Sequence, residues 1–201
     1  MNTRISQAVD RALDHRHREA TDEVERILAA AVDVMDQMAP EAPRVGDIVA
    51  AAGSSKKTFY RYFTGKDELL LAVMERGIGM VSSYLEHQLA KEVRPADKIA
   101  RWVEGVLAQV ADPHLISMSR AVIAQMSTSA QAGPVNDIMA PMRDLLVGPV
   151  AALGSDDPDR DAEAVFQLTM ATMRRYVGSG TAPGPDDIGH LVRFCLRGLA
   201  A

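Results

Sequence analysis

A short basic segment, residues 53–66, holds the side chains of this sequence best suited to chemistry on another molecule. It carries four cations and no acid, the cations being Lys56, Lys57, Arg61 and Lys66. Four of the nine aromatic residues of the chain also lie in this segment. Cations, hydroxyls and phenols contact phosphate oxygens, and Lys and Arg also reach guanine edges. The segment therefore favours a nucleic-acid partner, although a solvent-exposed basic helix side is also common in proteins without one.

The overall charge points the other way. The 201 residues include 22 Lys and Arg against 27 Asp and Glu, a formal net charge of −5. Nucleic-acid-binding domains usually have a basic balance. The charge is segregated, however, because residues 48–66 carry +4 and the rest of the chain therefore carries −9. The acidic total does not exclude DNA as a partner.

Helical periodicity explains how the basic segment would be presented. At about 100° per residue, Phe59 and Phe63 share one side of a helix, and Lys57 and Arg61 lie on the opposite side. A short helix is predicted just before it at 45–52, and Gly53 suits a left-handed C-cap. Two short helices joined by a tight turn form a helix-turn-helix, whose second helix fits the major groove of DNA.

The remaining sequence is also predicted to be helical. Strand-like runs are scarce, and breaker residues such as Pro95, Pro113 and Pro134 divide the apolar stripes. We expect an all-α fold of about nine helices, with a capping box formed by Thr64 and Asp67. The first helix is expected to start near Thr21, and the others are expected at 45–52, 55–63, 66–90, 95–110, 114–129, 135–153, 159–177 and 185–199.

The residues themselves resemble the TetR family of bacterial transcriptional regulators over about a quarter of the chain. The matching stretches are 25–31, 45–53, 55–63 and 66–70, including a Lys-x-Thr-aromatic-Tyr-x-Tyr-Phe-x-x-Lys string from 56 to 66. The resemblance implies a flexible N-terminal extension at 1–20, a three-helix helix-turn-helix domain at 21–65, and a helical effector-binding and dimerisation domain at 66–201.

The same resemblance implies which residues touch DNA. Base-edge contacts are expected from Lys56, Lys57 and Thr58, and phosphate contacts from Ser54, Ser55, Tyr60, Tyr62 and Lys66. Arg61 lies on the basic side of the same helix. The sequence departs from the family pattern at Ala39-Pro40, Gly46 and Ser54, and at Pro43-Arg44, where a Thr pair is usual. Arg44 is expected to supply a charge in place of the missing hydroxyl.

The implied function is a DNA-binding regulator: a homodimeric repressor, released from its operator by a small, mostly apolar ligand. It is not expected to be an enzyme or to need a cofactor. The candidate ligand-binding residues are Trp102, Met118, Met126, Met139, Met142, Phe166, Met170 and Met173. The candidate dimer-interface residues are Val165, Leu168, Tyr176, Ile188, Leu191, Val192, Cys195 and Leu199.

The first twenty residues allow two interpretations. Arg4, Arg11, Arg16 and Arg18 would suit an arm that follows the DNA backbone or enters the minor groove. Asp10, Asp14 and Glu19 are interspersed with them and favour a frayed tail. The stretch has no apolar run of the kind that a secretory signal needs, and no segment of the chain suits a membrane span, so a cytoplasmic protein is expected.

An all-helical small-molecule enzyme is the alternative function. The acidic run Asp156-Asp157-Pro158-Asp159-Arg160-Asp161 would then hold a metal ion. The spacing does not fit a calcium loop, because Ala162 and Leu168 occupy the positions of its glycine and terminal glutamate. Acids at a helix N-terminus explain the run better. The one cysteine, Cys195, excludes a disulfide within the chain and is expected to pack rather than react.

Overall fold

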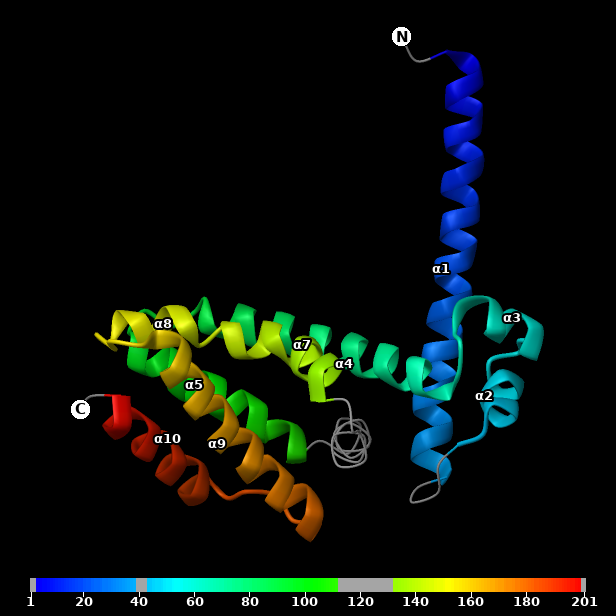
Figure 1. Ribbon diagram of the computed structural model, residues 1–201. Coiled ribbons are helices and arrows are strands. Elements are labelled where there is room, and N and C mark those ends of the chain that lie inside the picture. Colours follow the sequence, from blue (N-terminus) through cyan, green and yellow to red (C-terminus); the bar gives the residue numbers. More distant parts are fainter. Residues whose placement is uncertain (1–2, 39–42, 112–131, 200–201) are drawn as a thin grey trace. The chain divides into compact units, whose positions relative to one another are not determined.

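In this computed structural model, which describes residues 3–38, 43–111 and 132–199, every regular element is helical (Figure 1). The expected all-α class is confirmed, with nine α-helices and one short 3₁₀ helix in those ranges. The elements are α1 (Arg4–Met38), α2 (Val45–Ala51), α3 (Lys56–Tyr62), α4 (Lys66–Leu89), α5 (Pro95–Ala108), η1 (Gln109–Ala111), α7 (Ala132–Asp144), α8 (Val147–Ala152), α9 (Pro158–Ser179) and α10 (Pro185–Leu199).

The first helix is longer than the sequence pattern indicated. It begins at Arg4, so the expected start near Thr21 is wrong. The apolar stripe that marks a packed helix is weak before residue 20. A stripe is not needed there, because the packed turns after Ala20 already provide the helix nucleus. Each further residue then adds one hydrogen bond without a new nucleation cost.

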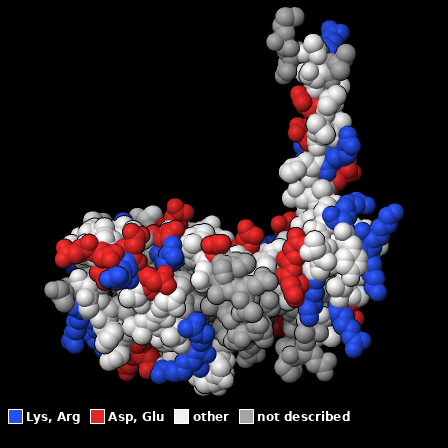
Figure 2. Space-filling model, in the orientation of Figure 1, with Lys and Arg blue, Asp and Glu red and all other residues white. Residues whose placement is uncertain are grey.

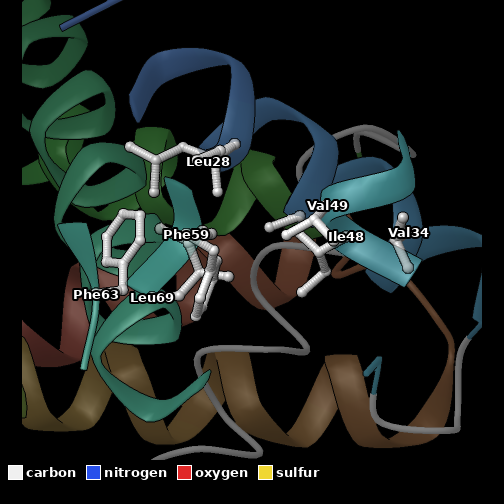
Figure 3. Packing of buried hydrophobic residues seen from close by; sticks show 10 residues of the cluster. Leu28, Val34, Ile48, Val49, Phe59, Phe63 and Leu69 are labelled. Carbon is white, nitrogen blue, oxygen red and sulfur yellow. The ribbon is translucent and has the colours of Figure 1, made fainter. Parts of the chain in front are cut away.

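Contacts divide the chain into two units after Val73, within α4. The N-terminal unit has a core of buried residues from all four of its helical segments (Figure 3). They are Ile27, Leu28, Ala31 and Val34 of α1, Ile48 and Val49 of α2, Phe59 of α3 with Phe63 after it, and Leu69 and Val73 of α4. The first two turns of α4 therefore belong to the N-terminal unit by packing.

The C-terminal unit packs α8, α9 and α10 against α5. Trp102 of α5 is fully buried, and its indole Nε1 donates a hydrogen bond to the carbonyl oxygen of Met142 at 2.9 Å. Its ring lies 6.1 Å from that of Phe166 on α9. One aromatic side chain thus joins α5 to both α7 and α9, and the bond gives the buried N–H the partner that it needs.

Two local expectations are corrected by the structure. The single helix expected at 135–153 is divided into α7 and α8 around Leu145 and Leu146. Pro149 explains the division, since it has no N–H for the carbonyl of residue 145 and its ring clashes with that carbonyl. The helix expected at 114–129 lies outside the described residues.

The cap of α4 also differs from the expected box. Glu68, rather than Asp67, reaches back to Thr64. Its Oε2 accepts hydrogen bonds from the backbone N–H and the hydroxyl of Thr64, each at 2.6 Å. The helix begins at Lys66, which makes Glu68 its third residue and gives it the position from which a side chain can reach back. None of the described helices is both long enough and apolar enough to cross a membrane.

Candidate nucleic-acid interface

The turn between α2 and α3 is tight and fully hydrogen-bonded. Gly53 has a φ of +60°, in the left-handed region that favours glycine. Its N–H donates to the carbonyl oxygen of Ala50 at 3.2 Å, and the N–H of Ser54 donates to that of Val49 at 2.9 Å. These bonds satisfy the last carbonyls of α2. The turn fixes the direction in which α3 leaves α2.

Ser55 starts α3 by capping it. Its Oγ accepts a hydrogen bond from the N–H of Thr58 at 3.1 Å and lies 2.9 Å from the Thr58 hydroxyl. An N-cap of this kind contributes about 1 kcal/mol to helix stability. Ser55 was expected to contact phosphate, and the structure shows that the hydroxyl already has a role within the protein.

The inner side of α3 is anchored in the core. Phe59 is fully buried, and Phe63, just beyond the helix, is 6% exposed. Their ring centroids lie 5.5 Å apart, and Figure 3 shows both rings among the side chains of α1 and α4. Aromatic rings of this size contribute most of the burial that holds a short helix in place. A seven-residue helix is too short to be stable alone, so these anchors fix α3.

The outer side of α3 carries the predicted DNA-contacting groups. Lys56, Lys57, Tyr60 and Arg61 are exposed, and Thr58 and Tyr62 are half-buried. The Arg61 guanidinium lies 5.8 Å from the centroid of the Tyr62 ring. Figure 2 shows Lys and Arg side chains gathered over this part of the N-terminal unit. The structure thus brings cations, a hydroxyl and phenols together on one short helix.

Two predicted contacts flank this surface at helix starts. Arg44 is exposed at the N-cap position of α2, and its backbone N–H donates to Asp47 Oδ2 at 3.3 Å. Lys66 is the first residue of α4 and is half-buried. Beside it, the two hydrogen bonds from Thr64 hold the pKa of Glu68 below its usual value. Helix N-termini favour phosphate through their free N–H groups.

One residue that positions the turn was missed in the sequence. Glu23 of α1 accepts a hydrogen bond from the Ser54 hydroxyl, from Oγ to Oε1, at 2.8 Å. The same carboxylate pairs with Arg26 at 3.0 Å. Ser54 was expected to contact phosphate, but its hydroxyl is directed to α1. The partners are 31 residues apart, and no periodic pattern connects residues across such a separation.

The candidate ligand-binding residues lie inside the C-terminal unit where they are described. Met139, Met142, Met170, Met173, Trp102 and Phe166 are all buried. Met118 and Met126 lie outside the described residues. Thr169 and Thr172 were candidates to orient a ligand, but their hydroxyls donate to backbone carbonyls four residues earlier, at 2.8 and 2.9 Å.

The candidate dimer residues divide into two groups. Val165, Tyr176, Leu191 and Cys195 are already buried within the single chain. Leu168, Ile188, Val192 and Leu199 are half-buried. Burial raises the pKa of the Cys195 thiol above its usual value, which disfavours the reactive thiolate. Phe194, which the sequence stripe did not include, is 62% exposed on α10.

The acidic run before α9 makes helix-starting contacts. Asp157 is the N-cap, and its side chain accepts a hydrogen bond from the N–H of Arg160 at 3.3 Å. Asp161 accepts from the Ser155 hydroxyl at 2.6 Å. Among the residues that the structure describes, no three His, Cys, Asp or Glu side chains are grouped so that they could hold a metal ion.

Comparison with known proteins points to one family. Residues 27–73 match the model of the bacterial regulatory proteins of the tetR family. A Mycobacterium tuberculosis protein named as the uncharacterized HTH-type transcriptional regulator Rv1255c is 29% identical over 156 residues, which are 74% of this chain and 73% of that protein. The HTH-type regulator YvdT of Bacillus subtilis is 34% identical over 58 residues, 29% of this chain and 30% of that protein.

Solved structures share the fold of the whole chain. A TetR-family regulator from Rhodococcus sp. has a TM-score of 0.71 at 19% identity, covering 90% of this chain and 100% of that chain. The regulator FadR of Bacillus subtilis, solved in complex with stearoyl-CoA, has a TM-score of 0.69 at 18% identity, covering 88% and 97%. The matched residues 27–73 contain the helix-turn-helix and its core. The chain therefore belongs to the TetR family of bacterial transcriptional regulators.

Proposed function

We propose that the chain is a dimeric repressor that binds operator DNA through α3 and leaves it when a small, mostly apolar ligand binds. The observation that carries the proposal is the two-sided character of α3. Phe59 is fully buried on one side, while Lys56, Lys57 and Arg61 are exposed and free of any described acid partner. A rigidly anchored basic helix suits the major groove, where Lys and Arg contact guanine edges.

The distribution of charge supports specific rather than indiscriminate binding. The segment 48–66 carries +4 while the rest of the chain carries −9. Neutralised phosphates release counterions, so affinity from so few cations falls steeply with salt. The acidic remainder repels DNA that does not meet the basic helix. In a dimer, two such helices would need to lie about 34–36 Å apart to enter successive major grooves.

The helix α4 supports a mechanism for ligand response. Its first turns contribute Leu69 and Val73 to the N-terminal core, and its later turns contribute Val81, Leu85 and Leu89 to the C-terminal unit. A ligand held among 66–201 that displaced α4 would change the separation of the two reading helices in the dimer and weaken the complex. By linkage, DNA would weaken ligand binding by the same factor.

The apolar character of the ligand is supported by two observations. The described candidate residues are four methionines, one tryptophan and one phenylalanine, all buried. Methionine side chains adapt to apolar ligands of irregular shape. A regulator of the same fold, FadR of Bacillus subtilis, is solved in complex with stearoyl-CoA. We propose a ligand with a substantial hydrocarbon part for this chain.

The experiment that tests the proposal uses duplex DNA selected by the full-length protein from a random pool. Tyr62→Phe and Lys66→Ala should each weaken binding to the selected duplex by roughly 1–3 kcal/mol and make its salt dependence shallower. Lys91→Ala, an exposed lysine outside the N-terminal unit, is the matched control and should bind as the wild type does. Full binding by both test variants overturns the site, and failure to select any duplex overturns the function.

A further inference from the structure

The first turns of α1 form a helical extension, residues 4–19, that packs against nothing else in the N-terminal unit. Nearly every described side chain in it is exposed, including Val9 at 52% and Leu13 at 54%. Figure 1 shows α1 continuing well past α2 and α3. At 1.5 Å per residue the extension is about 24 Å long, which matches roughly seven base pairs at 3.4 Å each.

Three arginines form a stripe along this extension. Arg4, Arg11 and Arg18 recur every seven residues. A straight helix drifts only about 20° per seven residues, so the three side chains lie within about 40° of one another. All three are exposed, and none forms an ion pair with a carboxylate in the described part of the chain. Asp14 borders the stripe and Asp10 lies further around the helix. Figure 2 shows both charges on this segment.

Helix stability does not explain the arginine stripe. The macrodipole favours acids at a helix N-terminus, yet the first turn of α1 contains Arg4 and no acid. The start is capped instead by Thr3, whose Oγ1 accepts a hydrogen bond from the N–H of Ser6 at 3.3 Å. Farther along, His15 and Glu19 pair at 3.3 Å, and this pair does not involve the arginines. The three cations are left available to a partner outside the chain.

The base of the extension lies beside the start of α3. Glu23 of α1 accepts the hydrogen bond from Ser54, which immediately precedes the N-cap of α3. Glu23 is one helical turn from the end of the extension. In helix-turn-helix proteins the N-terminal residues of the reading helix contact the base edges. The extension therefore leaves the N-terminal unit at the point where the proposed function puts the DNA.

We propose that the arginine stripe of the α1 extension, Arg4, Arg11 and Arg18, is a second DNA-contacting surface that binds the phosphate backbone outside the base pairs that α3 reads. The proposal rests on the DNA-binding function proposed above. Duplex DNA fits better than a protein partner, because the three unpaired cations complement phosphate and the surface is continuous with the basic side of α3. The exposed Val9 and Leu13 on the other side provide the competing test of a protein partner.

The test replaces the three arginines together, Arg4→Gln, Arg11→Gln and Arg18→Gln, in the full-length protein. Glutamine has nearly the helix propensity of arginine, so α1 should keep its length by circular dichroism. Binding to the selected duplex, flanked by about one helical turn on each side, is followed by fluorescence anisotropy between about 50 and 200 mM salt. We expect the salt slope to become shallower by up to about 3 per arm, at ~0.9 for each phosphate contact, with at least tenfold weaker binding.

Two further variants decide between explanations. Lys91→Gln, Arg160→Gln and Arg197→Gln remove the same charge from the C-terminal unit, and this control should retain the wild-type slope. Val9→Gln with Leu13→Gln tests the apolar side, and it should leave both DNA binding and the sedimentation coefficient unchanged. Wild-type binding by the arginine variant overturns the proposal, as does an equal loss in the charge control or a change of assembly in the apolar variant.

The same assay separates this proposal from the function on which it rests. Lys57→Gln changes a cation on α3 and should weaken binding to the selected duplex. If Lys57→Gln weakens binding and the arginine variant does not, only the second surface is wrong. If neither variant differs from the wild type, the assignment of α3 as the reading helix fails as well.

Discussion

The two units of this protein place their candidate functional side chains in opposite environments. In the N-terminal unit the DNA-contacting candidates Lys56, Lys57 and Arg61 are exposed, and the core beneath them is made of other residues. In the C-terminal unit the described ligand-binding candidates, such as Trp102 and Met170, are themselves buried. Binding and stability can therefore be altered separately in the first unit, whereas in the second one substitution changes both.

The clearest way to break this comparison is to remove the anchor of α3. Phe59→Ala should destabilise the N-terminal unit by about 3–5 kcal/mol, because it leaves a cavity in place of a fully buried ring. DNA binding should be lost with the fold. Tyr60→Ala, next to it and 59% exposed, should cost less than about 1 kcal/mol. Denaturant unfolding measures both, and equal losses would show that α3 is not anchored as described.

The corresponding substitution in the C-terminal unit is Met170→Ala on α9. Met170 is 3% exposed, so we expect a loss of about 2–5 kcal/mol in stability. Gln167, exposed one turn earlier and hydrogen-bonded to Glu163 at 2.7 Å, provides the control Gln167→Ala, with an expected loss below about 1 kcal/mol. A Met170→Ala variant as stable as the control would show that this residue can be spared by the core.

The two environments also explain what the sequence could predict. Around α3 the side chains alternate sharply between apolar and basic, so α2, α3 and the start of α4 were placed within a residue or two. The extension of α1 was missed because it has no packed side to produce a stripe. The contact between Ser54 and Glu23 depends on how α1 crosses the turn, and spacing along the chain carries no information about it.

The C-terminal unit was less predictable for a related reason. The starts of α5, α9 and α10 follow from Pro95, Pro158 and Pro185 at or next to the expected positions. The division between α7 and α8 was missed because Gly148 and Pro149 lie inside an otherwise regular apolar pattern. An amphipathic stripe also does not say whether it faces its own chain or another copy. Leu191 and Cys195 belong to the stripe expected at the dimer interface, yet both are buried within one chain.

A smaller effect at Ser55 would sharpen the separation of stability from binding in the N-terminal unit. Ser55→Ala removes the N-cap of α3 and should cost about 1 kcal/mol. Ser55→Asp keeps a capping oxygen and should retain the stability, but its negative charge at the DNA-facing end of α3 should weaken binding to the selected duplex. Thermal unfolding and anisotropy measure the two properties. A Ser55→Asp variant that binds DNA as the wild type does would contradict the orientation of α3.

The smallest expected effect is the pH dependence contributed by Glu68, and it has the opposite sign to that of a buried group. Hydrogen bonds from the hydroxyl and N–H of Thr64 lower the Glu68 pKa, whereas burial raises the pKa of Cys195. A carboxyl whose pKa is lower in the folded state stabilises the fold above its unfolded pKa, about 4.3 for glutamate. This stabilisation is lost as the pH falls through the lower folded pKa.

Comparing the wild type with Glu68→Gln isolates that contribution. The wild type should be more stable than the variant at neutral pH, and the difference should shrink once the pH falls below about 4.3. Asp67→Asn is the matched control on the same turn, because Asp67 makes none of the hydrogen bonds to Thr64 that hold Glu68. Its effect on stability should change less over this range. A difference for Glu68→Gln that stays constant from neutral to acid pH would show that Glu68 does not hold the start of α4 through its charge.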